Sequence, residues 1–310
     1  MKLSVYFGEN DRAGRDSLSD ALLDLFATRR LQASVLLHGI EGFGAKQHLH
    51  SQRLLTLSED LPLVATAVDT RERIEAVLPE VEAMVAEGLV TLERTGDELP
   101  GGDVKMTVYC GRKERSRGRP AFVTVVDLLR RSGLDGATVL LGVDGTMHGE
   151  RRRARFFASN AGVPLMILAV GPSERVGAAV AELDGLLERP LVTLERVSSR
   201  PVATPWEKLT VYTSRPLHLE LVRRLRAAGA AGATCQRGIW GYAGDQAPHG
   251  DRLLALRREV PVVTTVVDDA ARTPEWFELA SAMTRAGGLV TREGLPFVSV
   301  HKGKPGPGSE

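Results

Sequence analysis

Hydrophobic and polar residues change their periodicity in a fixed order along the first hundred residues. The run KLSVYF at 2–7 alternates polar and apolar positions, as a half-buried strand does, and apolar residues then recur at helical spacing through 18–26. Two β-rich runs follow, ASVLLHGIEG at 33–42 and LPLVATAVD at 61–69. A second amphipathic helix and a last strand, LVTLER at 89–94, complete the pattern. The predicted order is strand, helix, strand, strand, helix, strand.

The same landmarks return twice more along the chain. Val-Tyr strands place Tyr6, Tyr109 and Tyr212 at intervals of 103 residues. LVTLER recurs unchanged at 191–196 and in altered form, LVTREG, at 289–294. A glycine ending the second strand precedes the proline of the third strand by 23, 22 and 23 residues in the three copies. Such self-similarity is the signature of tandem repeats. We therefore expect three units, at 1–96, 104–198 and 207–302, followed by a disordered Pro/Gly-rich tail at 303–310.

The order of elements predicts an α+β protein made of three tandem ferredoxin-like (βαββαβ) repeats. Two βαβ crossovers place both helices of a unit on one face of an antiparallel sheet, which leaves the other face bare. Three bare faces of similar size can bury one another. We therefore expect three sheets around a pseudo-threefold axis with the helices outside.

Composition is that of an ordinary globular protein, with 43% hydrophobic, 25% charged and 5% aromatic residues. No apolar run is long enough for a membrane helix, and the chain begins directly with a strand pattern, so a cytoplasmic location is expected. Cys110 and Cys235 stand in different repeats without a CxxC pair, which favours two buried free thiols. Charge is uneven: residues 1–103 carry 10 basic and 18 acidic side chains, whereas residues 104–200 carry 16 and 10. The asymmetry suits docking of neighbouring repeats or a site for an anion.

Several runs in the first repeat, VYFGEND, HGIEGFG and LLTLSEDLPLVATAVDTRERIEAVLPEVEAMVAEGLVTLE, resemble a bacterial PII-like family known as domain of unknown function 190 (DUF190). The third repeat matches in RGIWGY and VPVVTTVVDD, while the second departs at GVDGTMHG. The resemblance implies the fold of PII nitrogen-regulatory signalling proteins, which are trimers that bind nucleotides between subunits. It also implies a mobile loop between strands two and three that contacts a regulated protein, such as a membrane transporter or channel. A triplicated chain departs from the single-domain pattern, so we expect a monomer that acts as a pseudo-trimer.

Candidate ligand-binding residues gather where the second strand of each repeat ends. Glycines in GIEGFG, GVDGTM and GIWGYA permit close approach of backbone N–H groups to an anion, although they can equally just shape a strand end. Basic residues recur twelve and nine positions before the third-strand proline and would share one face if that stretch were helical. The candidates are Gly39, Glu41, Gly42, Phe43, Gly44, His50, Arg53, Gly142, Asp144, Gly145, Arg152, Arg155, Arg237, Gly238, Gly241, Tyr242, His249 and Arg252.

Other chemistries find less support in the sequence. His48 and His50 have no counterpart cluster in the other repeats, so no metal site is expected. The triple arginine at 151–153 lacks the aromatic residues of a nucleic-acid interface and is interpreted as a solvated or docking loop. No Ser/His/Asp set and no pair of carboxylates is expected at equivalent positions of the repeats, so no catalytic residue and no required cofactor are predicted.

The sequence therefore favours a non-enzymatic, PII-like sensor that binds a small anionic metabolite, with a nucleotide as one ligand class, between repeats. The alternative is an adaptor or structural protein that uses the same loops for protein docking without a ligand.

Overall fold

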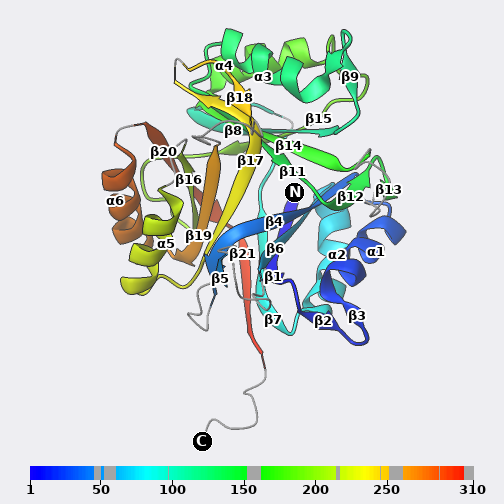
Figure 1. Cartoon of the computed structure of the whole chain (residues 1–310). Coiled ribbons are helices and arrows are strands. Elements are labelled where there is room, and N and C mark those ends of the chain that lie inside the picture. Colours follow the sequence, from blue (N-terminus) through cyan, green and yellow to red (C-terminus); the bar gives the residue numbers. More distant parts are fainter. Residues whose placement is uncertain are drawn as a thin grey trace, which may run out of the picture.

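A computed structural model of the chain describes residues 1–44, 61–96, 98–151, 162–213, 217–244, 246–250, 261–285 and 287–303, together with the backbone of 50–51. It is a mixed α+β protein whose described residues contain six α-helices and an extensive antiparallel β-structure. In Figure 1 the three repeats lie around a common centre, with their helices at the periphery. The predicted α+β class is confirmed, and the described part of the 303–310 tail is limited to Gly303.

Each repeat contains the predicted succession of long elements plus short hairpin strands. The first has β1 (Lys2–Gly8), β2 (Arg12–Ala13), β3 (Asp16–Ser17), α1 (Leu18–Thr28), β4 (Ala33–Phe43), β5 (His50–Ser51), β6 (Pro62–Val68), α2 (Arg71–Met84) and β7 (Glu87–Glu93). The second has β8 (Asp103–Gly111), β9 (Arg115–Ser116), β10 (Arg119–Pro120), α3 (Ala121–Arg131), β11 (Gly136–Leu141), β12 (Asp144–Met147), β13 (Glu150–Arg151), β14 (Pro164–Pro172), α4 (Ser173–Leu183) and β15 (Leu191–Arg196). The third has β16 (Trp206–Thr213), α5 (His218–Ala227), β17 (Ala233–Ala243), β18 (His249–Gly250), β19 (Val262–Asp269), α6 (Thr273–Thr284) and β20 (Gly288–Leu295), after which comes β21 (Phe297–Lys302).

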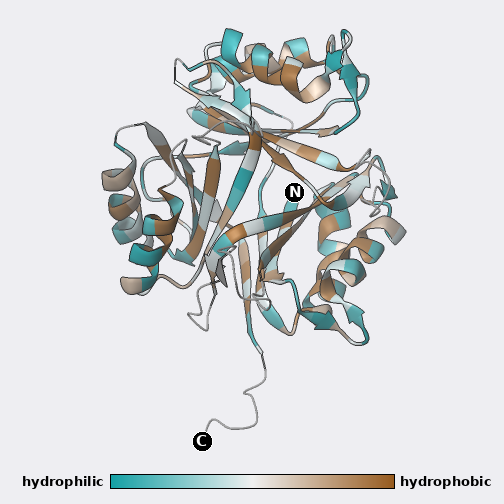
Figure 2. Ribbon diagram, in the orientation of Figure 1, coloured by the Kyte–Doolittle hydropathy of each residue, from teal (hydrophilic) through white to brown (hydrophobic). Residues whose placement is uncertain are grey.

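The helices begin and pack as their sequences dictate. Ser17 caps α1 by accepting a hydrogen bond from the backbone N–H of Asp20 at 3.1 Å. Leu22 and Phe26, one helical turn apart, are fully buried against the sheet. Each repeat has its own apolar core between helices and sheet, and a fourth cluster lies between the sheets. Figure 2 shows the apolar residues concentrated on the strands and on the helix faces turned toward them.

Within each repeat the first strand lies between the third and the fourth, and the second strand lies at the edge. All pairs are antiparallel, and the three sheets have the same order, β4-β6-β1-β7, β11-β14-β8-β15 and β17-β19-β16-β20.

The second strands join the repeats into a closed cycle. The end of β4 pairs with the start of β17, the end of β17 pairs with the start of β11, and β12, which follows β11, pairs with the start of β4. Every repeat therefore forms strand pairs with both of its neighbours. We call the three contact regions the 1/2, 2/3 and 3/1 junctions.

The fourth strands are also linked cyclically, by the segments that leave each repeat. Gly96 bridges to Leu194 on β15, and Ser198 bridges to Arg292 on β20. The sequence pattern did not predict β21, which pairs with β7 from Phe297↔Leu92 to Lys302↔Glu87. The chain thus returns from the third repeat to the first.

Two sequence-based expectations about chemistry can be checked at this level. Cys110 and Cys235 are buried free thiols, as predicted. No helix within the described residues combines the length and the apolar composition that crossing a membrane requires.

The cyclic pairing depends on glycines where strands of two repeats approach closely. A Cβ atom at Gly241 would lie 2.2 Å from the carbonyl oxygen of Ala137 and 2.8 Å from Cγ of Pro261. We expect Gly241→Ala to lower the free energy of unfolding by about 2 kcal/mol, because backbone must shift to relieve this overlap. Urea denaturation followed by circular dichroism measures the change. Gly44→Ala is the control, since a Cβ there meets nothing within 4 Å. Equal effects of the two substitutions would contradict this role for the glycine.

Candidate functional site

Most of the candidate glycines lie in paired strands that join the repeats, and the strands extend further than the sequence predicted. Their physical role is close approach: a Cβ at Gly42 would lie 2.6 Å from the carbonyl oxygen of Ala233, and one at Gly145 would lie 2.0 Å from that of Ser34. Gly39, Glu41, Gly42 and Phe43 belong to β4, Asp144 and Gly145 to β12, and Arg237, Gly238, Gly241 and Tyr242 to β17, while Gly44 follows β4 and Gly142 follows β11.

The two aromatic candidates are core residues of a neighbouring repeat. Phe43 is 4% exposed and packs in the core of the third repeat. Tyr242 is 2% exposed, packs in the core of the second repeat and donates a hydrogen bond from its hydroxyl to the carbonyl oxygen of Leu134 at 2.9 Å. Both residues hold junctions together and present little surface to a ligand.

Two of the basic candidates that precede the third strand, His50 and His249, lie in short β-strands and not in a helix. The backbone of His50 opens β5, which pairs with Gly42, and His249 opens β18, which pairs with Gly241. The backbone hydrogen-bonding groups at these positions pair with the preceding strand. Each position therefore belongs to a short β-hairpin and not to a helix. Arg53, Arg152, Arg155 and Arg252 lie outside the described residues.

The 1/2 junction is occupied by a side chain of the protein itself. Arg151 places its guanidinium among three carboxylates: it donates to Asp144 at 2.8 Å and to Asp20 at 3.2 Å, and it also contacts Asp24. Burial lowers the pKa of Arg151, but Asp144, Asp24 and Asp20 outweigh it and raise the pKa above its ordinary value. Asp20 and Asp24 belong to α1, so this arginine docks on the acidic first repeat, one of the interpretations that the sequence left open.

The 2/3 junction contains a cavity of about 630 Å³. It lies between the end of α3 in the second repeat and Gly244, which follows β17 of the third repeat. The backbone N–H of Gly244 donates to the carbonyl oxygen of Asp135 at 2.6 Å, which joins the two walls. The lining residues are Asp127, Arg130, Arg131, Gly133, Leu134, Asp135 and Gly244.

Sequence reasoning missed the helix side of this cavity. The candidate residues were chosen at positions repeated in all three units. Arg130 and Arg131 at the end of α3 are not such positions, because Ala27 and Thr28 stand there in the first repeat. The readable signal was two consecutive arginines at the end of α3, whereas α5 has Arg224 and Arg226 in its last turn and α1 has no basic residue there.

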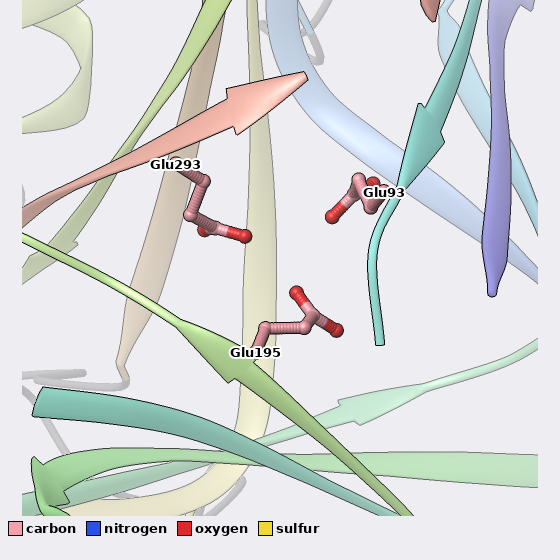
Figure 3. A group of neighbouring side chains, drawn as sticks. All are labelled: Glu93, Glu195 and Glu293. Atoms are coloured by element: carbon pink, nitrogen blue, oxygen red, sulfur yellow. The ribbon is translucent and has the colours of Figure 1, made fainter. Parts of the chain in front are cut away.

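The centre of the molecule holds a ring of six charged side chains, Lys2, Lys105, Lys208, Glu93, Glu195 and Glu293, which we call the central ring. The sequence analysis did not identify this set, in which each repeat contributes one lysine and one glutamate. The three glutamates lie in the LVTLER and LVTREG strands, and Figure 3 shows them converging from β7, β15 and β20. Side-chain exposure is between 3% and 6% for all six residues.

The contacts of the central ring alternate in sign and cross between repeats. Lys2 lies 2.6 Å from Glu93 and 2.8 Å from Glu195 of the next repeat. Lys105 contacts Glu195 and lies 2.5 Å from Glu293 of the third repeat. Lys208 contacts Glu93, which closes the ring, and lies 3.8 Å from Glu293. Each lysine therefore links its own repeat to the next.

Burial and neighbouring charges set the protonation of the central ring. Burial opposes the charge on Glu195 and Glu93, but lysine neighbours outweigh it, so the pKa of Glu195 lies well below its ordinary value and that of Glu93 is about 2. Lys208 and Glu293 form the most widely spaced contact of the ring, and there the effect of burial outweighs that of the neighbouring charges. Burial therefore raises the pKa of Glu293 and lowers the pKa of Lys208.

The three glutamates could suggest a metal site, since oxygen atoms from all three lie within 4.8 Å of one another. Three lysine ammonium groups already supply positive charge to these carboxylates. A metal ion would have to displace them from a fully buried position. The geometry therefore fits a link between repeats and does not fit a cation site.

Comparisons with known proteins agree with the internal repetition. The family model DUF190, described as "Uncharacterized ACR, COG1993", matches residues 1–96, 103–199 and 207–296. A UPF0166 protein of Aquifex aeolicus (strain VF5) is 33% identical over 79 residues, which are 26% of this chain and 81% of the relative. Another UPF0166 protein of the same organism is 26% identical over 91 residues, 29% of this chain and 86% of the relative.

One solved structure gives a weak similarity. Aspartate kinase from Synechocystis aligns with a TM-score of 0.29 and 12% identity over 94% of this chain. This chain spans 43% of the kinase chain. A score this low supports no argument about fold or activity.

Proposed function

The chain belongs to the DUF190 family over all three repeats, and from this membership we propose that it is a PII-like sensor that binds a small anionic ligand between two repeats. Its architecture would be a pseudo-trimer of ferredoxin-like units carried by one chain. The common strand order of the three sheets and the cyclic pairing of β4, β17, β11 and β12 support this proposal.

The cavity at the 2/3 junction is the observation that carries the proposal. Its volume of about 630 Å³ lies within the range of small-molecule sites. Arg130 and Arg131 offer planar guanidinium groups suited to phosphate or carboxylate, and both are exposed to solvent. Six of its seven lining residues come from the second repeat and Gly244 comes from the third, so a ligand there would contact both repeats.

The regulatory output would come from the segment between β17 and β19. Gly241, at the close crossing with β11, and Gly244, at the cavity, form the base of this segment. A ligand that contacts both repeats would shift the population of its conformations and change the surface presented to a partner protein. Binding, without turnover, is sufficient for this role.

The 1/2 junction is less suited to an anion. Arg151 is already surrounded by Asp20, Asp24 and Asp144, so the net charge of the four groups is negative. Of these two junctions, we therefore propose the 2/3 junction as the ligand site.

Isothermal titration calorimetry with ATP, ADP and cyclic di-AMP tests this proposal. We expect at least one of them to bind with a stoichiometry near one, and Arg130→Ala/Arg131→Ala to weaken that binding at least tenfold, as loss of charged hydrogen bonds predicts. Arg223→Ala/Arg226→Ala is the matched control, because it also removes two exposed arginines, from the corresponding helix α5. Native mass spectrometry should show one chain and one ligand per particle. Absence of binding by all three probes, or equal binding by the double variant, contradicts the site.

A further inference from the structure

The hairpin between β8 and α3 carries an unusual concentration of positive charge. Within residues 112–119 it has five basic side chains and one acid, Glu114. All five basic residues are exposed, and Figure 1 places the hairpin at the periphery beside α3. Figure 2 shows the region in the hydrophilic colour. The basic residues are Arg112, Lys113, Arg115, Arg117 and Arg119.

Little of this charge is neutralised by the protein. Arg119 lies 2.8 Å from Asp127 on α3, and Arg115 donates to the carbonyl oxygen of Gly118 at 3.2 Å. Arg112, Lys113 and Arg117 form no salt bridge with any residue that the structure describes. Three cations of this hairpin are therefore available to an external partner.

The fold of the hairpin does not require these cations, because the first repeat builds the same hairpin without them. The backbone N–H of Gly111 donates to Glu114 Oε2 at 3.0 Å, and that of Gly8 donates to Asp11 Oδ2 at 2.8 Å. In both hairpins the carbonyl oxygen of this acidic residue accepts from the first residue of the helix. The positions of Arg112, Lys113 and Arg117 are occupied there by Glu9, Asn10 and Gly14.

Arg117 adopts a backbone conformation that is energetically unfavourable for arginine. Its φ of 50° lies in the left-handed region, as does the φ of 65° at Gly14. Glycine adopts this conformation more easily than arginine does. A residue held at a disfavoured backbone position marks a candidate for function.

From this charge pattern we propose that the β9–β10 hairpin is a peripheral docking surface for an anionic lipid membrane. The basic residues sit on a short projecting tip, and lipid headgroups can move laterally to gather around such a tip. Residues 111–120 contain no aromatic side chain to stack on bases, and a tip this short reaches few phosphates of a duplex. They also contain no large apolar side chain, so binding is electrostatic and does not involve insertion.

Co-sedimentation with vesicles tests the proposal in the full chain. We expect binding to phosphatidylcholine vesicles that contain about 30% phosphatidylserine, no binding to pure phosphatidylcholine vesicles, and loss of binding when the salt concentration rises from 0.1 to about 0.5 M. The variant Arg112→Glu/Lys113→Asn/Arg117→Gly gives the hairpin the residues of the first repeat. It should lower the partition coefficient by about 100-fold, since each basic residue contributes roughly fivefold.

The matched control is Arg12→Glu/Arg15→Glu, which makes the same change of net charge on the hairpin of the first repeat. It should alter vesicle binding by less than about threefold, because the local patch decides binding and not the total charge. Circular dichroism melting verifies that both variants fold. Absence of vesicle binding by the unaltered protein, equal loss in both variants, or binding to a 20-base-pair DNA duplex in preference to vesicles would each overturn the proposal.

Discussion

Replacing Lys105 with methionine is expected to lower the free energy of unfolding by about 3–5 kcal/mol. Lys105 lies 2.5 Å from Glu293 and 3.7 Å from Glu93, contacts Glu195, and has a side chain only 3% exposed. Methionine fills similar volume but leaves three buried carboxylates with two ammonium groups. An uncompensated charge in a buried position carries a penalty of this size. Urea denaturation followed by circular dichroism at pH 7 measures the change.

Two further variants separate charge from packing. Lys302→Met removes an exposed lysine from β21 and should change the free energy of unfolding by less than about 0.5 kcal/mol. Lys105→Met/Glu293→Gln restores equal numbers of positive and negative charges and should recover part of the loss. A loss below 1 kcal/mol in Lys105→Met, or no recovery in the double variant, would show that the central ring is not held together by charge.

The central ring also shows where sequence reasoning reached its limit. The alternation in KLSVYF correctly predicted a strand, with Leu3 and Val5 on the helix-facing side. It left Lys2, Ser4 and Tyr6 on the other face, which period-two alternation alone would assign to solvent. Lys2 and Ser4 are buried and Tyr6 is partly buried because two other repeats cover this face, and the charge of Lys2 is balanced by Glu195, 193 positions away. A local pattern contains no information about a partner so distant in sequence.

A readable signal nevertheless existed. Lys2, Lys105 and Lys208 are spaced by 103 residues, and each stands four residues before a Val-Tyr landmark tyrosine. Glu93, Glu195 and Glu293 occupy the fifth position of each closing strand. A basic and an acidic residue recurring at fixed positions of adjacent strands in three units indicate ion pairing across the centre once the bare faces are expected to meet.

The junctions were harder to predict than the repeats. The glycine-containing segments were expected to open a loop, yet β4 and β17 continue through them because their hydrogen-bond partners lie in another repeat. Those partners depend on the assembly and not on local sequence. The three junctions have also diverged: Arg151 fills one, and Arg130 and Arg131 line a cavity in another. A search for features shared by all repeats cannot find sites that belong to one of them.

Glu93→Gln is expected to lower the free energy of unfolding at pH 7 by about 3 kcal/mol and to remove part of the acid sensitivity of the protein. Burial opposes the charge of Glu93, but Lys2 and Lys208 outweigh it and hold its pKa at about 2, below the value of about 4.3 in an unfolded chain. Because the folded-state pKa is the lower one, the stability contributed by Glu93 is complete above about pH 5 and is lost as the pH falls toward 2.

Glu293→Gln is the matched control within the same ring. Burial raises the pKa of Glu293, so the folded protein binds this proton more tightly than the unfolded chain does. Its contribution to stability is therefore present at low pH and is lost as the pH rises through the folded pKa, opposite to that of Glu93. Urea denaturation of both variants from pH 2 to pH 7 should show a smaller loss at pH 7 for Glu293→Gln than for Glu93→Gln, and a flatter pH profile only for Glu93→Gln. Identical losses and identical profiles would mean that the two carboxylates share charge equally around the central ring, and that its wider contact at Lys208 has no energetic consequence.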